Sequence, residues 1–333
     1  MKKILIAILV LISMVSCTKS FKINVNLENS TDKTVYLQKY VDGTFKNVDS
    51  VVAKDNLAVF SIQQSVVCEP YNIMMKGWKR PLVVFADNQD VTISGDCQKY
   101  SEIKVKASAT QELLNIFNAE MNLLKTEEEM YYAAMGFVKE NSNNIVSPFV
   151  LYRYKGFFKL DELERLYETF PETVQGTYKD LVLKYIEKVR TTEPGQPYID
   201  FTMKDLNGND LALSTVVGNS KFVILDFWAS WCPDCRANNP ELVKVYNMYK
   251  DKGLDVFSVS LDENETAWKE AIEKDGLTWT NHVSDLKRWN NEAADLYGVA
   301  FIPQTFLIDD NGIILEKNLP DDKLEEVLSS RLK

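Results

Sequence analysis

The chain has 333 residues, of which 45% are hydrophobic and 26% charged, a composition typical of globular proteins and a length sufficient for two or three domains. Its 48 acidic and 38 basic residues leave a net charge of −10, and without a basic face we expect no nucleic-acid partner. One histidine, His282, is too few for a multi-histidine metal site and argues against a Ser-His-Asp hydrolase. We expect His282 at the surface or at a strand edge.

Residues 1–16 have the features of a targeting segment. Lys2 and Lys3 precede an apolar run over residues 4–12, which is shorter than the roughly 20 residues that cross a bilayer. The segment resembles a bacterial lipoprotein signal, in which cleavage before a cysteine would make Cys17 the lipid-bearing N-terminus. We therefore predict a signal peptide over residues 1–16 and a lipid-anchored protein of the cell envelope, with its domains in the periplasm. An uncleaved anchor and soluble export are the alternatives.

Residues 17–107 show short runs in which apolar and polar side chains alternate, the pattern of half-buried strands. Residues 22–27 and 91–94 are examples. The pattern predicts a small antiparallel β-sandwich. In its order of strands and in Val48-Asp49-Ser50 followed by Phe60, this region resembles the β-rich domain of unassigned function found in envelope lipoproteins.

Cys68 and Cys97 fall within this β-rich region. We expect three successive antiparallel strands between them, at residues 71–75, 82–86 and 91–95. The two cysteines would then lie at opposite ends of one sheet, whereas a disulfide needs Cα atoms within roughly 7 Å, so unpaired thiols are the expectation and pairing stays open. Residues 78–80, Trp-Lys-Arg, could form a contact patch at a hairpin tip, but we expect a solvated turn.

Residues 108–190 change to an apolar spacing of three and four residues, which predicts amphipathic helices. Their aromatic side chains could line a ligand groove, although at helical spacing we expect them to pack against each other; they are Tyr131, Tyr132, Tyr152, Tyr154, Phe157 and Phe158. Residues 191–197 contain two prolines and a glycine and cannot continue a helix. They predict a linker between the helical connecting region and a last domain over residues 198–333.

In this last domain, residues 221–228 form a nearly continuous apolar run, typical of a strand buried on both faces, which only Asp226 interrupts. The sequence Trp231-Cys232-Pro233-Asp234-Cys235 follows, and it leads into a helical stretch over residues 238–249. The pattern predicts a strand, a tight turn and a helix, with two thiols in the first turn of the helix.

Two thiols in that position suit dithiol exchange. The unpaired N–H groups and the positive end of the helix dipole stabilise a thiolate, so we assign Cys232, at the exposed edge, as the nucleophile. Cys235, on the same turn, is the resolving thiol that attacks a mixed disulfide. Pro233 has no N–H to lose at the helix start and stiffens the turn. Asp234 should moderate how far the pKa of Cys232 falls, because its negative charge disfavours a thiolate.

The chain here resembles thioredoxin-like proteins of the exported TlpA-like branch, which is related to the AhpC/TSA peroxiredoxins. The matching segments are residues 226–229, residues 231–235, Pro240 and residues 298–309. In that family the proline matching Pro303 is cis and lies against the cysteine pair, which leaves the backbone of Ile302 to pair with substrate. The long interval between Cys235 and Pro303 is consistent with an inserted strand-helix unit.

The same resemblance implies that Asp226 transfers a proton to or from Cys235. A carboxylate that caps a backbone group near the motif is the alternative interpretation. Trp231 is expected to be an exposed substrate platform, with Pro233 beside it, whereas Trp228 should pack in the core.

These features predict a thiol:disulfide oxidoreductase with an α/β thioredoxin-like C-terminal domain and a redox-active disulfide, without a metal or cofactor. Its expected partners are disulfide-containing envelope proteins, which it would reduce, and a membrane redox donor. A thiol peroxidase would need a Pro-x-x-x-Thr-x-x-Cys segment that the sequence lacks, and a structural zinc site would need a second cysteine pair. A non-catalytic envelope scaffold that binds through its β-sandwich is the remaining alternative.

Overall fold

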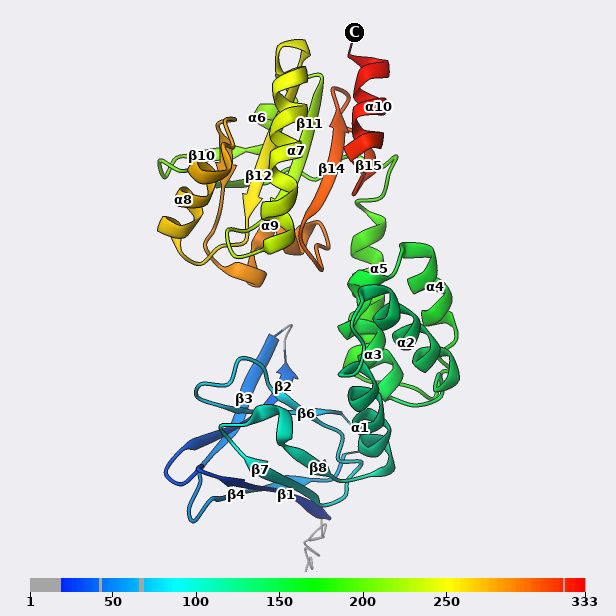
Figure 1. The fold of residues 1–333 in the computed structure, drawn as a ribbon. Helices are drawn as coiled ribbons and strands as arrows, with labels where there is room; N and C mark the ends of the chain where they lie inside the picture. The colour runs from blue at the N-terminus through cyan, green and yellow to red at the C-terminus, as the bar shows by residue number, and fades with distance from the viewer. Residues whose placement is uncertain (1–18, 42–43, 66–68, 320, 333) are drawn as a thin grey trace, which may run out of the picture. The chain divides into compact units, whose positions relative to one another are not determined.

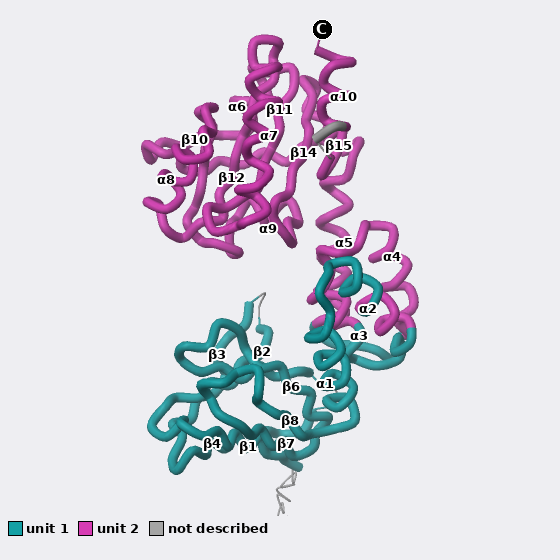
Figure 2. Tube along the Cα trace, viewed as in Figure 1, with its two compact units in different colours: residues 1–133, 140–147, 172–177 teal, residues 134–139, 148–171, 178–333 magenta. Residues whose placement is uncertain are grey.

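The computed structural model describes residues 19–41, 44–65, 69–319 and 321–332 (Figure 1). Cys17 and Cys68 lie outside these residues. The chain forms two compact units (Figure 2), and the division between them runs through the helical region. The first unit comprises residues 1–133, 140–147 and 172–177, and the second comprises residues 134–139, 148–171 and 178–333. The domain boundaries expected from the sequence stay predictions.

A β-sandwich of two four-stranded sheets, ordered β4-β1-β7-β8 and β3-β2-β5-β6, forms most of the first unit. Its strands are β1 (Ser20–Glu28), β2 (Thr34–Val41), β3 (Thr44–Val52), β4 (Leu57–Gln63), β5 (Tyr71–Met75), β6 (Leu82–Val84), β7 (Val91–Asp96) and β8 (Lys104–Lys106), with the 3-10 turn η1 (Tyr100–Glu102). Alternate side chains of β1, such as Ile23 and Val25, are fully buried in one core with Val35 and Ile73 of the other sheet. The predicted β-rich domain is confirmed.

The expectation of a wholly antiparallel sandwich is wrong, because β1 and β7 pair in parallel, with Ile23 opposite Val91. The three expected successive strands also divide between the sheets, since β5 pairs with β6 whereas β7 joins the sheet of β1. Alternation of apolar and polar residues predicts which face of a strand is buried. It does not predict which strand lies beside it, because that depends on the path of the connecting segments. Cys97 follows β7 and carries a buried free thiol, whose Sγ accepts a hydrogen bond from Lys33 Nζ at 3.3 Å.

The predicted helical region is confirmed by five helices: α1 (Ala109–Met121), α2 (Glu127–Glu140), α3 (Val146–Arg153), α4 (Leu160–Glu168) and α5 (Thr177–Arg190), with the 3-10 turn η2 (Lys155–Phe157). α5 ends before the segment that was expected to be a linker. That segment pairs with the edge of the following domain, because Gly195 N donates to Ile314 O at 2.7 Å and Ile314 N donates to Gln196 O at 2.9 Å. Among the described residues, no helix is long and apolar enough to cross a membrane.

A five-stranded mixed sheet in the order β13-β12-β11-β14-β15 is the centre of the second unit. The elements are β9 (Thr202–Lys204), β10 (Asp210–Ala212), α6 (Leu213–Val217), β11 (Phe222–Trp228), α7 (Pro233–Tyr249), η3 (Lys250–Lys252), β12 (Leu254–Ser260), α8 (Glu265–Asp275), β13 (Asn281–Val283), η4 (Arg288–Asn290), α9 (Glu292–Leu296), β14 (Gln304–Asp309), β15 (Ile314–Lys317) and α10 (Asp321–Arg331). Every residue of β11 is buried, as its apolar run predicts. β12 runs parallel to β11 and β14 antiparallel to it, and α7 lies across the sheet (Figure 1). The predicted thioredoxin-like α/β domain is confirmed, and β12, α8 and β13 occupy the long interval between the cysteine pair and Pro303.

Two side chains, Trp78 and His282, are less exposed than the sequence led us to expect. Lys79 and Arg80 are exposed, as a solvated turn predicts, but Trp78 is half-buried against the sandwich core, and its Nε1 donates to Cys97 O at 2.9 Å. His282 lies on the edge strand β13 but is buried, stacked on Trp279 with its Nε2 3.2 Å from Leu277 O. Burial lowers the pKa of His282 to about 4, so the imidazole is neutral at pH 7.

Candidate active site

A disulfide joins Cys232 and Cys235 at the start of α7, with Cα atoms 5.3 Å apart. Cys232 is the N-cap of the helix, and its Sγ accepts a hydrogen bond from Cys235 N at 3.1 Å. Pro233 is the first helical residue and Asp234 lies exposed in the first turn. After reduction, the amide and the helix dipole would stabilise a thiolate on Cys232, so the site can carry out dithiol exchange.

The expectation that Cys232 is exposed is wrong. Cys232 is 4% exposed and Cys235 is 1% exposed, so both sulfurs are largely covered in the oxidised state. The Ile302-Pro303 peptide bond is cis, and Ile302 O lies 3.7 Å from Cys232 Sγ. The covering loop comes from a segment 70 residues further along the chain, which is why local sequence could not show it.

Asp226 is buried near the disulfide, in a cavity that Cys235 also lines. It is 4% exposed on β11, and burial raises its pKa to about 7, against the opposing effect of a hydrogen bond from Ser258 Oγ at 3.0 Å. Trp279 Nε1 donates to Ser258 Oγ, also at 3.0 Å, and so orients that hydroxyl. A cavity of about 280 Å³ is lined by both Asp226 and Cys235. It is large enough for water, so a proton could pass between the carboxyl and the thiol through it.

A buried carboxylate, Asp262, fixes the loop that precedes the cysteines. Its two oxygens accept hydrogen bonds from Ser230 N at 2.9 Å and from Ser230 Oγ at 2.6 Å, and Ser260 Oγ adds a third at 2.7 Å. The neighbouring Trp231 Nε1 donates to Leu261 O at 3.1 Å. We did not single out Asp262 from the sequence. Its position just after the strand that neighbours β11 was the available signal, because adjacent parallel strands end at the same edge of a sheet.

An ion pair secures the other side of the loop. Arg236 binds the Asp275 carboxylate through Nε and, at 2.6 Å, through Nη2, while its Nη1 donates to Ser230 O at 3.2 Å. Asn239 Nδ2 donates to the same carboxylate at 2.7 Å. The first turns of α7 are thereby tied to the end of α8.

Trp231 has an aromatic neighbour that sequence reasoning missed. Trp231 is 38% exposed and Trp289 is 46% exposed, and their ring centroids are 6.0 Å apart. The guanidinium of Arg288 lies 5.2 Å from the Trp231 ring centroid. The two indoles, one on the loop that carries Cys232 and one in η4, therefore form an exposed aromatic surface.

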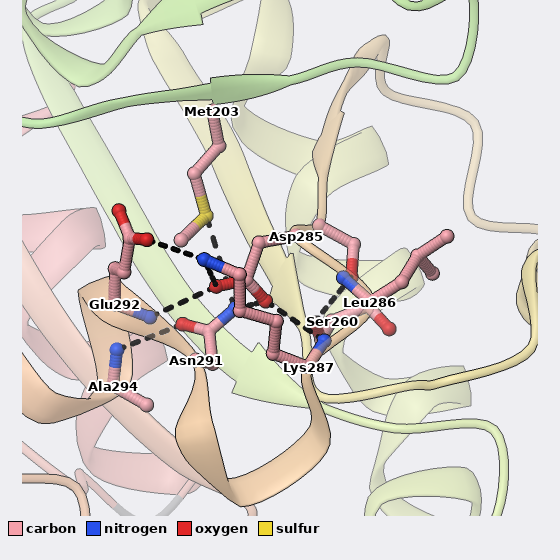
Figure 3. Close-up of polar contacts among 9 residues, drawn as sticks. Met203, Ser260, Asp285, Leu286, Lys287, Asn291, Glu292 and Ala294 are labelled. Carbon is pink, nitrogen blue, oxygen red and sulfur yellow. Dashed lines mark hydrogen bonds and ion pairs between the residues drawn. The ribbon is translucent and has the colours of Figure 1, made fainter.

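A polar network holds the turn that carries Trp289 (Figure 3). Asp285 accepts hydrogen bonds from Asn291 Nδ2 at 2.9 Å and from the backbone N–H groups of Lys287 and Glu292 at 3.1 and 3.0 Å. Asn291 Oδ1 in turn caps α9 by accepting from Ala294 N at 2.9 Å. Figure 3 shows the Asp285 carboxylate among these contacts, which link the two ends of the segment that carries Trp289.

The structure thus places Trp231, Pro233, Ile302 and Pro303 around Cys232, and Asp226 in the wall of the cavity that Cys235 also lines. The catalytic and substrate-binding roles of these residues stay predictions. Among the described residues, no group of three or more His, Cys, Asp or Glu side chains could hold a metal ion. Lipid attachment at Cys17 falls outside the described residues.

Two protein families and several named relatives match parts of this chain. The AhpC/TSA family matches residues 194–317, and a domain of unknown function, DUF4369, matches residues 21–114. The thiol-disulfide oxidoreductase ResA of Oceanobacillus iheyensis is 35% identical over 137 residues, which cover 39% of this chain and 68% of that protein. The protein of the same name from Bacillus cereus is 29% identical over 149 residues, which cover 45% of this chain and 82% of that protein.

Two solved structures match the second unit. The thioredoxin domain of one from Bacteroides vulgatus is 35% identical, with 42% of this chain and 98% of that chain covered and a TM-score of 0.39. A thiol-disulfide oxidoreductase from Bacteroides fragilis is 30% identical, with 40% of this chain and all of that chain covered and a TM-score of 0.37.

Proposed function

The chain belongs to the ResA family of thiol-disulfide oxidoreductases, and we propose that it acts in the cell envelope as a reductant of disulfides in exported proteins. The observation that carries this proposal is the Cys232–Cys235 pair in the first turn of α7, with the Ile302-Pro303 loop against Cys232. A helix N-terminus favours the thiolate that attacks a disulfide. The exposed carboxylate of Asp234 in the same turn limits that stabilisation, which favours a reductant over a strong oxidant.

In the proposed reaction, the reduced enzyme transfers two electrons to its substrate. The Cys232 thiolate attacks one sulfur of the substrate disulfide, a mixed disulfide forms, and the other substrate sulfur leaves and takes up a proton. Cys235 gives its proton to Asp226 and attacks Cys232 Sγ. The second substrate sulfur then leaves as a thiol, and the enzyme is left as the Cys232–Cys235 disulfide. A membrane dithiol donor must return two electrons and two protons before the next cycle.

A redox titration against glutathione tests the direction. We expect a potential near the thioredoxin end of the scale, about −270 mV, because Asp234 disfavours the thiolate. A potential near the DsbA end, about −120 mV, would instead identify an oxidase.

We further propose that Cys17 carries the lipid that anchors the protein to a membrane, with its domains outside the cytoplasm. The support is the short apolar run before Cys17. In cells grown with radiolabelled palmitate, the wild-type protein should be labelled and pellet with membranes, whereas Cys17→Ser should be unlabelled. Equal labelling of the two proteins would contradict lipid attachment at this residue.

A further inference from the structure

A groove of about 580 Å³ opens on the second unit beside the cis peptide bond. One wall comes from the helical region and includes Gly156, Phe157 and Tyr185. The other comes from the sheet domain and includes Phe301 and Gln304, the residues on either side of Ile302-Pro303. The groove is therefore continuous with the loop that lies against Cys232.

The helical wall is fixed to the sheet domain by polar contacts on both sides. Lys188 Nζ and Asp295 Oδ1 are 2.5 Å apart, and Lys317 Nζ donates to Glu193 Oε1 at 3.2 Å. At Gly156 the approach is close, because a Cβ there would lie 3.2 Å from Phe301 Cδ1 and 3.3 Å from Ala300 Cβ. The turn η2 thus touches the chain immediately before the cis bond.

Gln304 is a polar residue of the groove whose side-chain oxygen lacks a hydrogen-bond donor in the part of the chain that the structure describes. It is 3% exposed, and its side-chain carbonyl oxygen is buried with no hydrogen-bond partner among the described residues. A buried acceptor without a donor lowers the stability of the fold. Successive side chains of β14 point to opposite faces, so Thr305 lines the cavity of Asp226 whereas Gln304 lines the groove. A donor on a bound molecule would supply the missing hydrogen bond.

We propose that the groove binds the polypeptide segment next to the substrate cysteine, with Gln304 accepting a hydrogen bond from a backbone N–H of that segment. An extended chain advances about 3.3 Å per residue, so a segment that starts at the cysteine bonded to Cys232 reaches Gln304 within a few residues. Phe301, which is 42% exposed, offers a surface for one apolar side chain of the segment. The inference rests on the proposed function and assigns to the groove the part of the substrate next to the reacting cysteine.

The charges of the groove favour a neutral segment. Three of its four carboxylates are paired: Glu193 with Lys317, Glu164 with Arg190 at 2.5 Å, and Asp161 with Arg165 at 2.7 Å. Paired charges leave little net attraction for an acidic or a basic partner. We therefore expect the groove to prefer a segment that offers an apolar side chain and a free backbone N–H group.

The test compares two disulfide substrates. The first is the disulfide-linked dimer of a short neutral peptide that contains one cysteine, and the second is bis(2-hydroxyethyl) disulfide, which has no amide groups. In one peptide series, each residue flanking the cysteine is N-methylated in turn, which removes one donor at a time. The rate at which reduced wild-type enzyme is oxidised should fall about fivefold at one position, in keeping with the loss of one hydrogen bond. The same methylation should change the rate of Gln304→Met much less.

Gln304→Met keeps the side-chain volume and removes the unsatisfied acceptor. Its peptide rate relative to its bis(2-hydroxyethyl) disulfide rate should fall about fivefold, while its melting temperature holds or rises. Equal sensitivity of wild type and variant to every methylation would overturn the proposal. If the wild-type enzyme is oxidised by neither substrate, the proposed function itself fails.

Gly156→Ala tests the helical wall. Its methyl group should displace Phe301 and lower the peptide rate relative to the bis(2-hydroxyethyl) disulfide rate. Gly136→Ala, on α2, is the matched control, because a Cβ there meets no atom within 4 Å and all rates should match wild type. Identical behaviour of the two variants would contradict the proposed participation of the helical region.

Discussion

Asp226 and Cys235, both buried, line one cavity beside the disulfide. Burial raises the pKa of Asp226 from its ordinary value of 3.8 to about 7, so near neutral pH the carboxyl can both accept and return a proton.

Asp226→Asn separates this role from a structural one. Because the folded-state pKa is raised, the wild type should lose stability as the pH rises from about 4 to about 7, by an amount on the order of a few kcal/mol. The Asn variant should lack this loss and be the more stable protein at pH 7, yet turn over more slowly. Urea unfolding of the oxidised proteins across pH, with turnover measured alongside, provides the check. Unchanged turnover at every pH would return Asp226 to a structural role.

Asp262→Asn should loosen the loop that carries Trp231 and Cys232. The amide keeps one accepting oxygen and replaces the other with a donor, so at least one of the hydrogen bonds from Ser230 and Ser260 is lost, at a cost of about 1–3 kcal/mol. A lower urea midpoint and a slower reaction with disulfides should result. Asp310→Asn, at an exposed position in the turn between β14 and β15, should change neither. Wild-type stability of the Asp262 variant would show that the loop holds without this carboxylate.

Trp289→Ala should remove half of the aromatic surface beside Cys232. We expect KM for a protein disulfide to rise several-fold with little change in kcat, because an exposed indole contributes to docking more than to the exchange step. Tyr132→Ala, at another exposed aromatic residue, on α2, is the control and should leave KM unchanged. A fall in kcat alone, with KM unchanged, would contradict a docking role.

The chemistry of the site was predictable because its signals are local. The cysteine pair, the strand before it and the acid within that strand all lie within residues 221–235, where a strand, a turn and a helix start follow directly from apolar pattern and spacing. Asp262, Trp289 and Gln304 were missed because their surroundings include segments far along the chain. The unsatisfied oxygen of Gln304, for example, is defined only by what packs around β14. The parallel pairing of β1 with β7 was missed for the same reason.

Trapping with Cys235→Ser tests the oxidoreductase mechanism most directly. Without the resolving thiol, the Cys232 thiolate can attack a substrate disulfide but the mixed disulfide cannot be released. Cells that carry the variant should accumulate covalent adducts with envelope proteins, which dissolve on reduction and are identified by mass spectrometry. A variant with both Cys232→Ser and Cys235→Ser should trap nothing. If Cys235→Ser also traps nothing, while the β-sandwich alone still captures a ligand, the protein is a scaffold and the mechanism proposed here is wrong.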